Sequence, residues 1–173
     1  MTQENLDATN NPTPFGKGVK QRDLIKMTPE EIEAFLSEWH TMNIATINHD
    51  NTIHLVAMWY GFIEGCPALE TKAKSQKVNN LRRNPQITCL IEEGDSYDQL
   101  RGVEMVGHAE IVEDPDQIFT LGVSVFERTS GAPYTEEMRP AVEMMINKRV
   151  AIKIHIDKYV SWDHRKLGLP SMG

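Results

Sequence analysis

Hydrophobic residues repeat along the chain with two different periods, and the change from one to the other marks the expected elements. After a polar start, apolar positions three or four residues apart predict a first helix from residue 28 onward. Thr28 can cap this helix, Pro29 suits its first turn, and Glu31 is placed to complete a capping box. The helix is expected to bury one face, made of Ile32, Phe35, Leu36 and Trp39.

Beyond residue 42 the period shortens to two, which is typical of strands. Strands are expected over residues 43–48, 52–63, 68–71, 86–92, 100–112 and 149–157, and further helices over residues 75–83, 115–127 and 139–148. In the last strand, alternation predicts inward side chains at Val150, Ile152, Ile154 and Ile156, and outward ones at Ala151, Lys153, His155 and Asp157. Short turns between most of the strands favour a closed antiparallel barrel with peripheral helices over a doubly wound parallel sheet.

Polarity separates a short N-terminal stretch from the rest of the chain. Residues 1–19 carry prolines and glycines among polar side chains and predict a mobile arm, whereas residues 20–173 are expected to form one domain. The longest apolar run, residues 55–63, is too short to span a bilayer, and the first residues do not resemble a secretion signal. We therefore expect a cytoplasmic protein that has no membrane partner.

The charge of the chain narrows the choice of ligand. With 18 basic and 25 acidic residues the formal net charge is −7, which argues against a nucleic-acid partner. Five basic residues nevertheless lie within twelve positions, namely Lys72, Lys74, Lys77, Arg82 and Arg83. A local positive patch on an acidic chain favours a small anionic ligand.

The spacing of histidines and cysteines does not indicate a metal site. The six histidines show no paired or HxxEH arrangement, so we expect no bound metal. Cys66 and Cys89 form no CxxC motif. A disulfide and two unpaired thiols both stay open, and a reducing cytosol favours the thiols.

The stretch from Glu70 to Lys77 carries most of the candidate chemistry. It joins the end of an expected strand to the start of a helix, where unpaired main-chain N–H groups and the helix dipole favour an anion. Thr71 and Ser75 add hydroxyl groups, and Lys77 places in the first turn a positive charge that opposes the dipole. A bound phosphate would explain that charge. Alternatively, Ser75 only caps the helix and the lysines form a solvated face.

This stretch resembles the phosphate-binding segment of the pyridoxamine 5'-phosphate oxidase-like superfamily. Its members are split barrels that bind flavin mononucleotide (FMN) or the deazaflavin coenzyme F420. The pattern in that superfamily is a threonine, a Ser-Arg-Lys group four residues later, and a helix that ends in Asn-Pro or Asp-Pro. Here the matching positions are Thr71, Ser75 to Lys77, and Asn84-Pro85. The resemblance covers about residues 42–113, and residues 160–166 resemble the deazaflavin branch.

The resemblance implies a six-stranded split barrel that works as a homodimer with the cofactor at the subunit interface. Its reaction would be hydride transfer between F420 or FMN and a small unsaturated or quinone-like molecule. The implied cofactor-binding residues are Val56, Ala57, Met58 and Trp59 for the ring, Thr71, Ser75, Gln76 and Lys77 for the phosphate, Arg82 for the acidic periphery, and Trp162 closing the pocket from the second subunit. No residue is singled out as catalytic.

The sequence also departs from the oxidase pattern. Leu55 and Tyr60 stand where the oxidases have an arginine and a lysine on the flavin phosphate, and Gln76 replaces the arginine of the Ser-Arg-Lys group. The C-terminal Arg-x-His substrate clamp has no clear counterpart, so pyridoxamine phosphate is not the expected substrate. The run from Asn80 to Pro85 favours F420 over FMN. Two other functions stay open: a flavin carrier without turnover, and a haem-binding split barrel.

Overall fold

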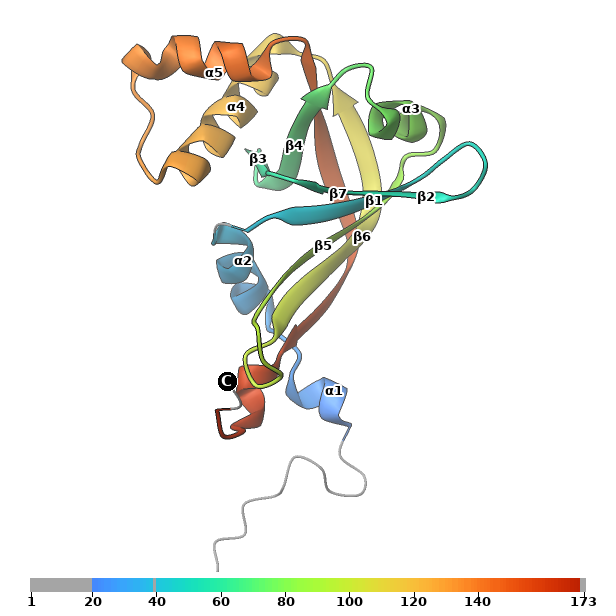
Figure 1. The fold of residues 1–173 in the computed structure, drawn as a ribbon, viewed down its shortest axis with the longest axis vertical. Helices are drawn as coiled ribbons and strands as arrows, with labels where there is room; N and C mark the ends of the chain where they lie inside the picture. Colours follow the sequence, from blue (N-terminus) through green and yellow to red (C-terminus); the bar gives the residue numbers. More distant parts are fainter. Residues whose placement is uncertain (1–19, 39, 172–173) are drawn as a thin grey trace, which may run out of the picture.

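A computed structural model describes residues 20–38 and 40–171 (Figure 1). The expected arm at residues 1–19 and the expected core position Trp39 lie outside the described residues. The strands are β1 (Met42–Ile47), β2 (Ile53–Met58), β3 (Gly61–Ile63), β4 (Cys66–Lys72), β5 (Gln86–Glu93), β6 (Arg101–Val112) and β7 (Arg149–Asp163). The helices are α1 (Gln21–Leu24), α2 (Pro29–Ser37), α3 (Gln76–Arg83), α4 (Pro115–Ser130) and α5 (Arg139–Ile146), with short 3-10 turns at Glu136–Met138 and His164–Leu167.

All seven strands belong to one antiparallel sheet with the order β2-β1-β5-β6-β7-β4-β3. The two edge strands, β2 and β3, follow each other in the chain and are joined only by Trp59 and Tyr60. The sheet must therefore curl so that its edges approach, and β2 crosses the long β6–β7 pair in Figure 1. The mainly-β split barrel with peripheral helices is confirmed.

The expected strand over residues 52–63 is divided into β2 and β3, which makes seven strands instead of six. The division falls at Tyr60, whose ring is fully buried and whose hydroxyl donates to the main-chain carbonyl of Leu36 at 2.8 Å. Burial raises the pKa of Tyr60 to about 12. Tyr60 is therefore a core residue that anchors the end of α2.

The start of α2 follows the sequence expectation. The Thr28 hydroxyl accepts from the main-chain N–H of Glu31, and the Glu31 carboxylate accepts from the main-chain N–H of Thr28 at 2.6 Å. This is the predicted capping box, and Ile32, Phe35 and Leu36 are buried as predicted.

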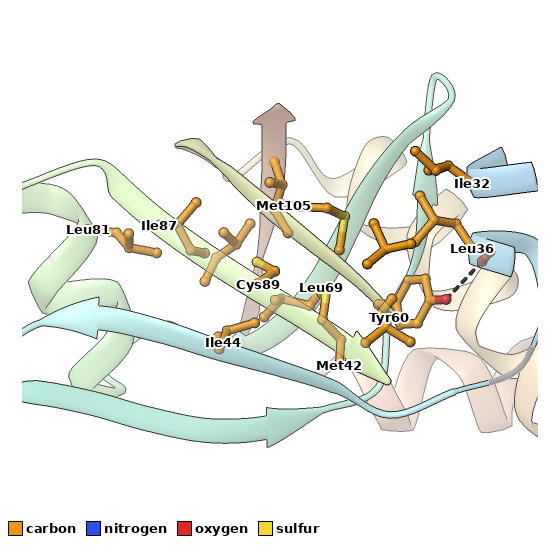
Figure 2. Close-up of a cluster of buried hydrophobic side chains, with 14 of the residues drawn as sticks. Ile32, Leu36, Met42, Ile44, Tyr60, Leu69, Leu81, Ile87, Cys89 and Met105 are labelled. Atoms are coloured by element: carbon orange, nitrogen blue, oxygen red, sulfur yellow. Dashed lines mark hydrogen bonds between the residues drawn. The ribbon is translucent and has the colours of Figure 1, made fainter. Parts of the chain in front are cut away.

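The larger of two hydrophobic cores fills the barrel between the sheet, α2 and α3 (Figure 2). Ile44, Tyr60, Leu69, Cys89 and Met105 are among its fully buried members. Cys89 and Cys66 are both unlinked thiols, and burial raises the pKa of Cys89 to about 12.

A second core lies on the outer side of β4 and β7, beneath α4. It corrects the expectation for the last strand, because Ala151 is fully buried and Lys153 is nearly so. Val150, Ile152 and Ile154 face the first core as expected, and α4 covers the opposite side of the same strand. The faces of β7 therefore alternate as predicted, but the outward side is covered at Ala151 and Lys153 instead of facing solvent.

Among the described residues, no helix is both long enough and apolar enough to cross a membrane.

Candidate cofactor site

The structure brings three of the predicted phosphate residues together where β4 ends and α3 begins. The ammonium group of Lys77 donates to the hydroxyl oxygen of Thr71 at 3.2 Å, and that hydroxyl in turn donates to Ser75 at 3.3 Å. Lys77 is only 8% exposed. Ser75 stands at the N-cap position of α3 but makes no side-chain capping bond, so the capping expected of it is not observed.

Arg149, the first residue of β7, adds a second positive charge to this site. In the ladder between β4 and β7 it lies opposite Lys72, next to Thr71. Burial lowers the pKa of Lys77, and the charge of Arg149 lowers it further. Within residues 20–38 and 40–171, no acidic group forms an ion pair with Lys77. A buried cation beside another cation fits a bound phosphate, which would neutralise both.

Gln76 takes part in a network of side-chain amides. It donates to Asn80 at 2.9 Å, and Asn80 donates to Asn48 at 2.9 Å and to the Thr46 hydroxyl at 3.0 Å. These bonds fix α3 against the β1–β2 turn. Gln76 therefore supports the position of the helix from which Lys77 projects.

The residues expected to hold the ring lie on β2 and just after it. The side chains of Val56 and Met58 pack toward the first core, whereas Ala57 and Trp59 face outward and are exposed. β2 is an edge strand that pairs only with β1, so in the described structure no strand occupies its other edge. Main-chain groups along that edge are therefore open to pairing with another chain or a ligand.

A pocket of about 230 Å³ lies between the end of β2 and the residues Glu70 and Arg149, and we call it the Glu70 pocket. It is lined by Ala57, Met58, Trp59, Glu70, Val125, Met145 and Arg149. Glu70 projects from β4 on the side opposite to Thr71, and it is 5% exposed. Burial raises the pKa of the Glu70 carboxyl, while Arg149 and Lys72 act in the opposite direction. The sequence analysis singled out neither Glu70 nor Arg149 as a site residue.

Two of the predicted site residues lie away from this cluster. Arg82 projects from the far end of α3 and forms an ion pair with Glu113 at 2.6 Å. Trp162 lies near the C-terminal end of β7, opposite Gly102, and that glycine leaves room for the indole ring. Thr71 pairs with the beginning of the same strand, so Trp162 and the phosphate residues occupy opposite ends of β7 within one chain.

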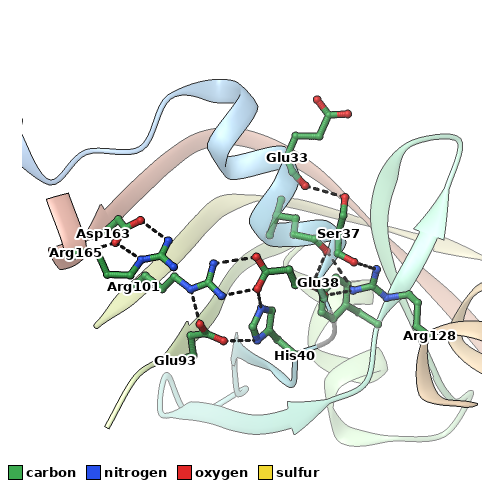
Figure 3. A network of polar contacts seen from close by, with 11 residues as sticks. Glu33, Ser37, Glu38, His40, Glu93, Arg101, Arg128, Asp163 and Arg165 are labelled. Carbon is green, nitrogen blue, oxygen red and sulfur yellow. Dashed lines mark hydrogen bonds and ion pairs between the residues drawn. The ribbon is translucent and has the colours of Figure 1, made fainter. Parts of the chain in front are cut away.

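A separate polar network joins the end of α2 to the barrel (Figure 3). The donor atoms of Glu38, His40 and Glu93 lie within 4.8 Å of one another, a grouping that could hold a metal. Arg101, however, forms ion pairs with both carboxylates, including one at 2.5 Å to Glu38. Its guanidinium also lies 4.7 Å from the centre of the Phe35 ring. Arg101 therefore neutralises the two carboxylates in place of a metal ion, and the network links the end of α2 to β5 and β6.

A larger cavity, of about 500 Å³, lies between α2, the β3–β4 turn and Tyr159. Its walls are mainly apolar, with Ile32, Leu36, Phe62 and Pro67 among them. In the described part of the chain, no buried polar side-chain atom without a partner lines it. This separates it from the Glu70 pocket, where such atoms occur.

A curled antiparallel barrel with a buried lysine at a strand-to-helix junction defines the class of pyridoxamine 5'-phosphate oxidase-like split barrels. The sequence model for pyridoxamine 5'-phosphate oxidase matches residues 18–163, and the chain belongs to this family. A search of curated proteins found no match.

Solved structures agree with this assignment. The conserved hypothetical protein Rv2991 of Mycobacterium tuberculosis is 53% identical, with a TM-score of 0.85, over 89% of this chain and 96% of that one. An F420 reductase is 26% identical, with a TM-score of 0.59, over 76% of this chain and 98% of that one. The haem storage protein HutZ of Vibrio cholerae is 14% identical, with a TM-score of 0.59 over 77% and 94%, and shares the fold alone.

Proposed function

We propose that the protein is a cytoplasmic oxidoreductase that transfers a hydride between F420 or FMN and a small unsaturated or quinone-like molecule. The observation that carries this proposal is the buried ammonium of Lys77, which contacts the hydroxyl of Thr71 and lies near the charge of Arg149. Among the described residues, Lys77 forms no ion pair with an acidic group. A phosphate group on the cofactor is the partner that this arrangement lacks. The similarity to an F420 reductase supports the choice of cofactor.

The residues of this chain would bind and orient the cofactor. Lys77 and Thr71 would hold the phosphate, Arg149 would add a nearby positive charge, and the exposed edge of β2 would contact the ring. The ring supplies the hydride chemistry when bound, so the protein needs to position and polarise the reactants. Arg82 is proposed only as an outer contact, because it is already paired with Glu113.

We also propose a homodimer formed through the outer face of the sheet. Leu55 and Val106 are exposed apolar side chains on this face, and the strand pairing places Ala45 and Thr88 between them in one row. Ile53 and Trp59 extend the apolar surface along β2. Exposed apolar patches of this kind are typical of protein interfaces.

Trp162 shares this outer face, since it pairs with Gly102, four residues before Val106 on β6. Pairing of two copies through the face would therefore bury Trp162 in the interface. This supports the proposal that Trp162 from a second copy closes the cofactor pocket.

The proposal is tested by titrating the purified full-length protein with FMN and with F420 and following the cofactor fluorescence. We compare the wild type with Lys77→Met, which keeps the length of the side chain and removes its charge, and with the exposed control Lys74→Met. Loss of a charged hydrogen bond to phosphate is expected to weaken binding by about tenfold or more. The control is expected to change binding by less than about threefold.

Four results would contradict this function. If neither cofactor binds, or if Lys77→Met binds as tightly as the wild type, the segment from Thr71 to Lys77 is only a helix start. A Soret band after addition of haemin, with no flavin binding, would favour the haem-binding alternative. Cofactor binding without turnover of any quinone or enone acceptor would identify a carrier.

A further inference from the structure

The Glu70 pocket contains two buried polar atoms that have no hydrogen-bond partner among residues 20–38 and 40–171. They are Oε2 of Glu70 and Nε of Arg149. The other carboxylate oxygen of Glu70 lies 3.9 Å from Nη1 of Arg149, an ion pair too long for a hydrogen bond. The side chain of Glu70 is only 5% exposed, and a buried acceptor without a hydrogen bond lowers the stability of the fold. The unpaired carboxylate oxygen therefore requires an explanation.

The charges around the pocket restrict what can satisfy these atoms. An anion in the pocket would be repelled by the Glu70 carboxylate. A cation would be repelled by Arg149 and by the nearby Lys77. A neutral group that offers one donor and one acceptor side by side avoids both conflicts. The remaining lining, from Ala57, Met58, Trp59, Val125 and Met145, is suited to a flat, mostly apolar body.

We propose that the Glu70 pocket binds the amide or imide edge of a flat heterocycle. Its N–H group donates to Oε2 of Glu70, and its carbonyl accepts from Nε of Arg149. This inference rests on the proposed function, because the pocket adjoins the strand where the ring is placed. Two sources offer the same chemistry: the pyrimidine-dione edge of the flavin or deazaflavin ring itself, and an imide or lactam on the substrate.

The first test uses ring compounds that lack a phosphate, so that the outcome does not depend on Lys77. We titrate the full-length protein with lumiflavin and with 3-methyl-lumiflavin, in which the imide N–H is blocked, and follow flavin fluorescence. The wild type is expected to bind lumiflavin at least about tenfold more tightly, because the methyl compound leaves Glu70 unpaired. Glu70→Met is expected to lose this discrimination, whereas Lys77→Met and the exposed control Glu137→Met keep it.

A second arm separates the two sources. Glutarimide, a bare imide, is titrated against the protein by calorimetry with and without saturating FMN. If FMN displaces glutarimide, the pocket binds the edge of the cofactor ring. If glutarimide binds together with FMN, the pocket binds the substrate. Equal binding of lumiflavin and its methyl derivative to the wild type, with glutarimide binding unaffected by Glu70→Met, would overturn the inference. If FMN does not bind but the protein still prefers lumiflavin to 3-methyl-lumiflavin, only the phosphate proposal is rejected.

The third readout needs no ligand. Removing one partner of a buried ion pair leaves the other charge uncompensated, whereas replacing both partners by apolar side chains is often neutral or stabilising. The double variant Glu70→Met/Arg149→Met is therefore expected to have a melting temperature equal to or above that of the wild type, because the two groups are only 3.9 Å apart and each keeps an unused polar atom. A clear fall of about 5 °C or more in the double variant would show that the pair stabilises the empty fold, and would contradict a ligand-binding role.

Discussion

Arg128 joins parts of the molecule that are distant in the sequence. It projects from α4, and its guanidinium donates to the main-chain carbonyls of Leu36, Ser37 and Glu38 at the end of α2 (Figure 3). It also lies 4.5 Å from the centre of the Tyr60 ring. These carbonyls are the groups that a helix end leaves without partners, so a cation there is favourable.

We expect Arg128→Met to lower the free energy of unfolding by about 2–3 kcal/mol, because several hydrogen bonds from a charged donor are lost together. The matched control is Arg82→Met, which breaks the exposed ion pair with Glu113 and is expected to cost less than about 1 kcal/mol. Urea unfolding followed by tryptophan fluorescence measures both. Equal effects of the two substitutions would contradict the capping role of Arg128.

At the scale of residues, the sequence predicts contacts between residues that are close together in the chain. Thr71, Ser75 and Lys77 meet because a strand end and a helix start are adjacent in the chain, and the spacing reveals this. Glu70 and Arg149 are brought together by the pairing of β4 with β7, across nearly eighty residues. Sequence spacing carries no information over that distance. Glu70 and Arg149 could therefore be recognised as neighbours only once the sheet order was known.

At the scale of elements, the long β6–β7 pair depends on a local irregularity. Its register shifts between Val106 and Gly107. A Cβ atom at Gly107 would lie only 2.0 Å from the main-chain oxygen of His155. The bulge therefore requires glycine for close approach of the two backbones.

Gly107→Ala is expected to destabilise the protein by about 2 kcal/mol or more, since the backbone on one strand has to move. Val106→Ala is the control next to it, where a side chain already exists and the expected cost is below about 1 kcal/mol. Thermal unfolding by circular dichroism compares the two. If Gly107→Ala has the same melting temperature as the wild type, the close approach of the two backbones at the bulge is not required in solution.

Element type was predictable almost throughout, and element ends were less so. The capping box set the start of α2 correctly because its bonds are local. The break between β2 and β3 was not predictable, since it depends on Tyr60 reaching the carbonyl of Leu36 on another element. The alternation gave the correct faces for Ala151 and Lys153 but not their burial, because alternation alone treats the outward face as exposed and α4 packs over this side of the sheet.

At the scale of the whole molecule, the outer face of the sheet is the surface for which a partner is proposed. Leu55 lies on this face in the edge strand β2, and its side chain is 66% exposed. We expect Leu55→Arg to convert a dimer into a monomer, because a charge would be buried in an apolar interface. Met144→Arg is the control, since Met144 is also an exposed apolar residue but lies on α5.

Size-exclusion chromatography with light scattering gives the mass of each variant. A dimeric Leu55→Arg variant, or a wild type that is already monomeric, would contradict the interface. If Leu55→Arg is monomeric and also loses cofactor binding while Lys77 is intact, the second copy contributes to the site, as proposed for Trp162.

The place of β7 in the sheet has a consequence for how the chain folds. β7 is the last of the seven described strands along the chain, yet it lies between β6 and β4 inside the sheet. Until it emerges, the β3–β4 hairpin has no neighbour to pair with, and the inner edges of β4 and β6 stay open. Barrel closure is therefore a late, non-local step, and such steps are slow. A nascent chain stalled before residue 149 would expose two unpaired strand edges, which makes it a natural client of chaperones.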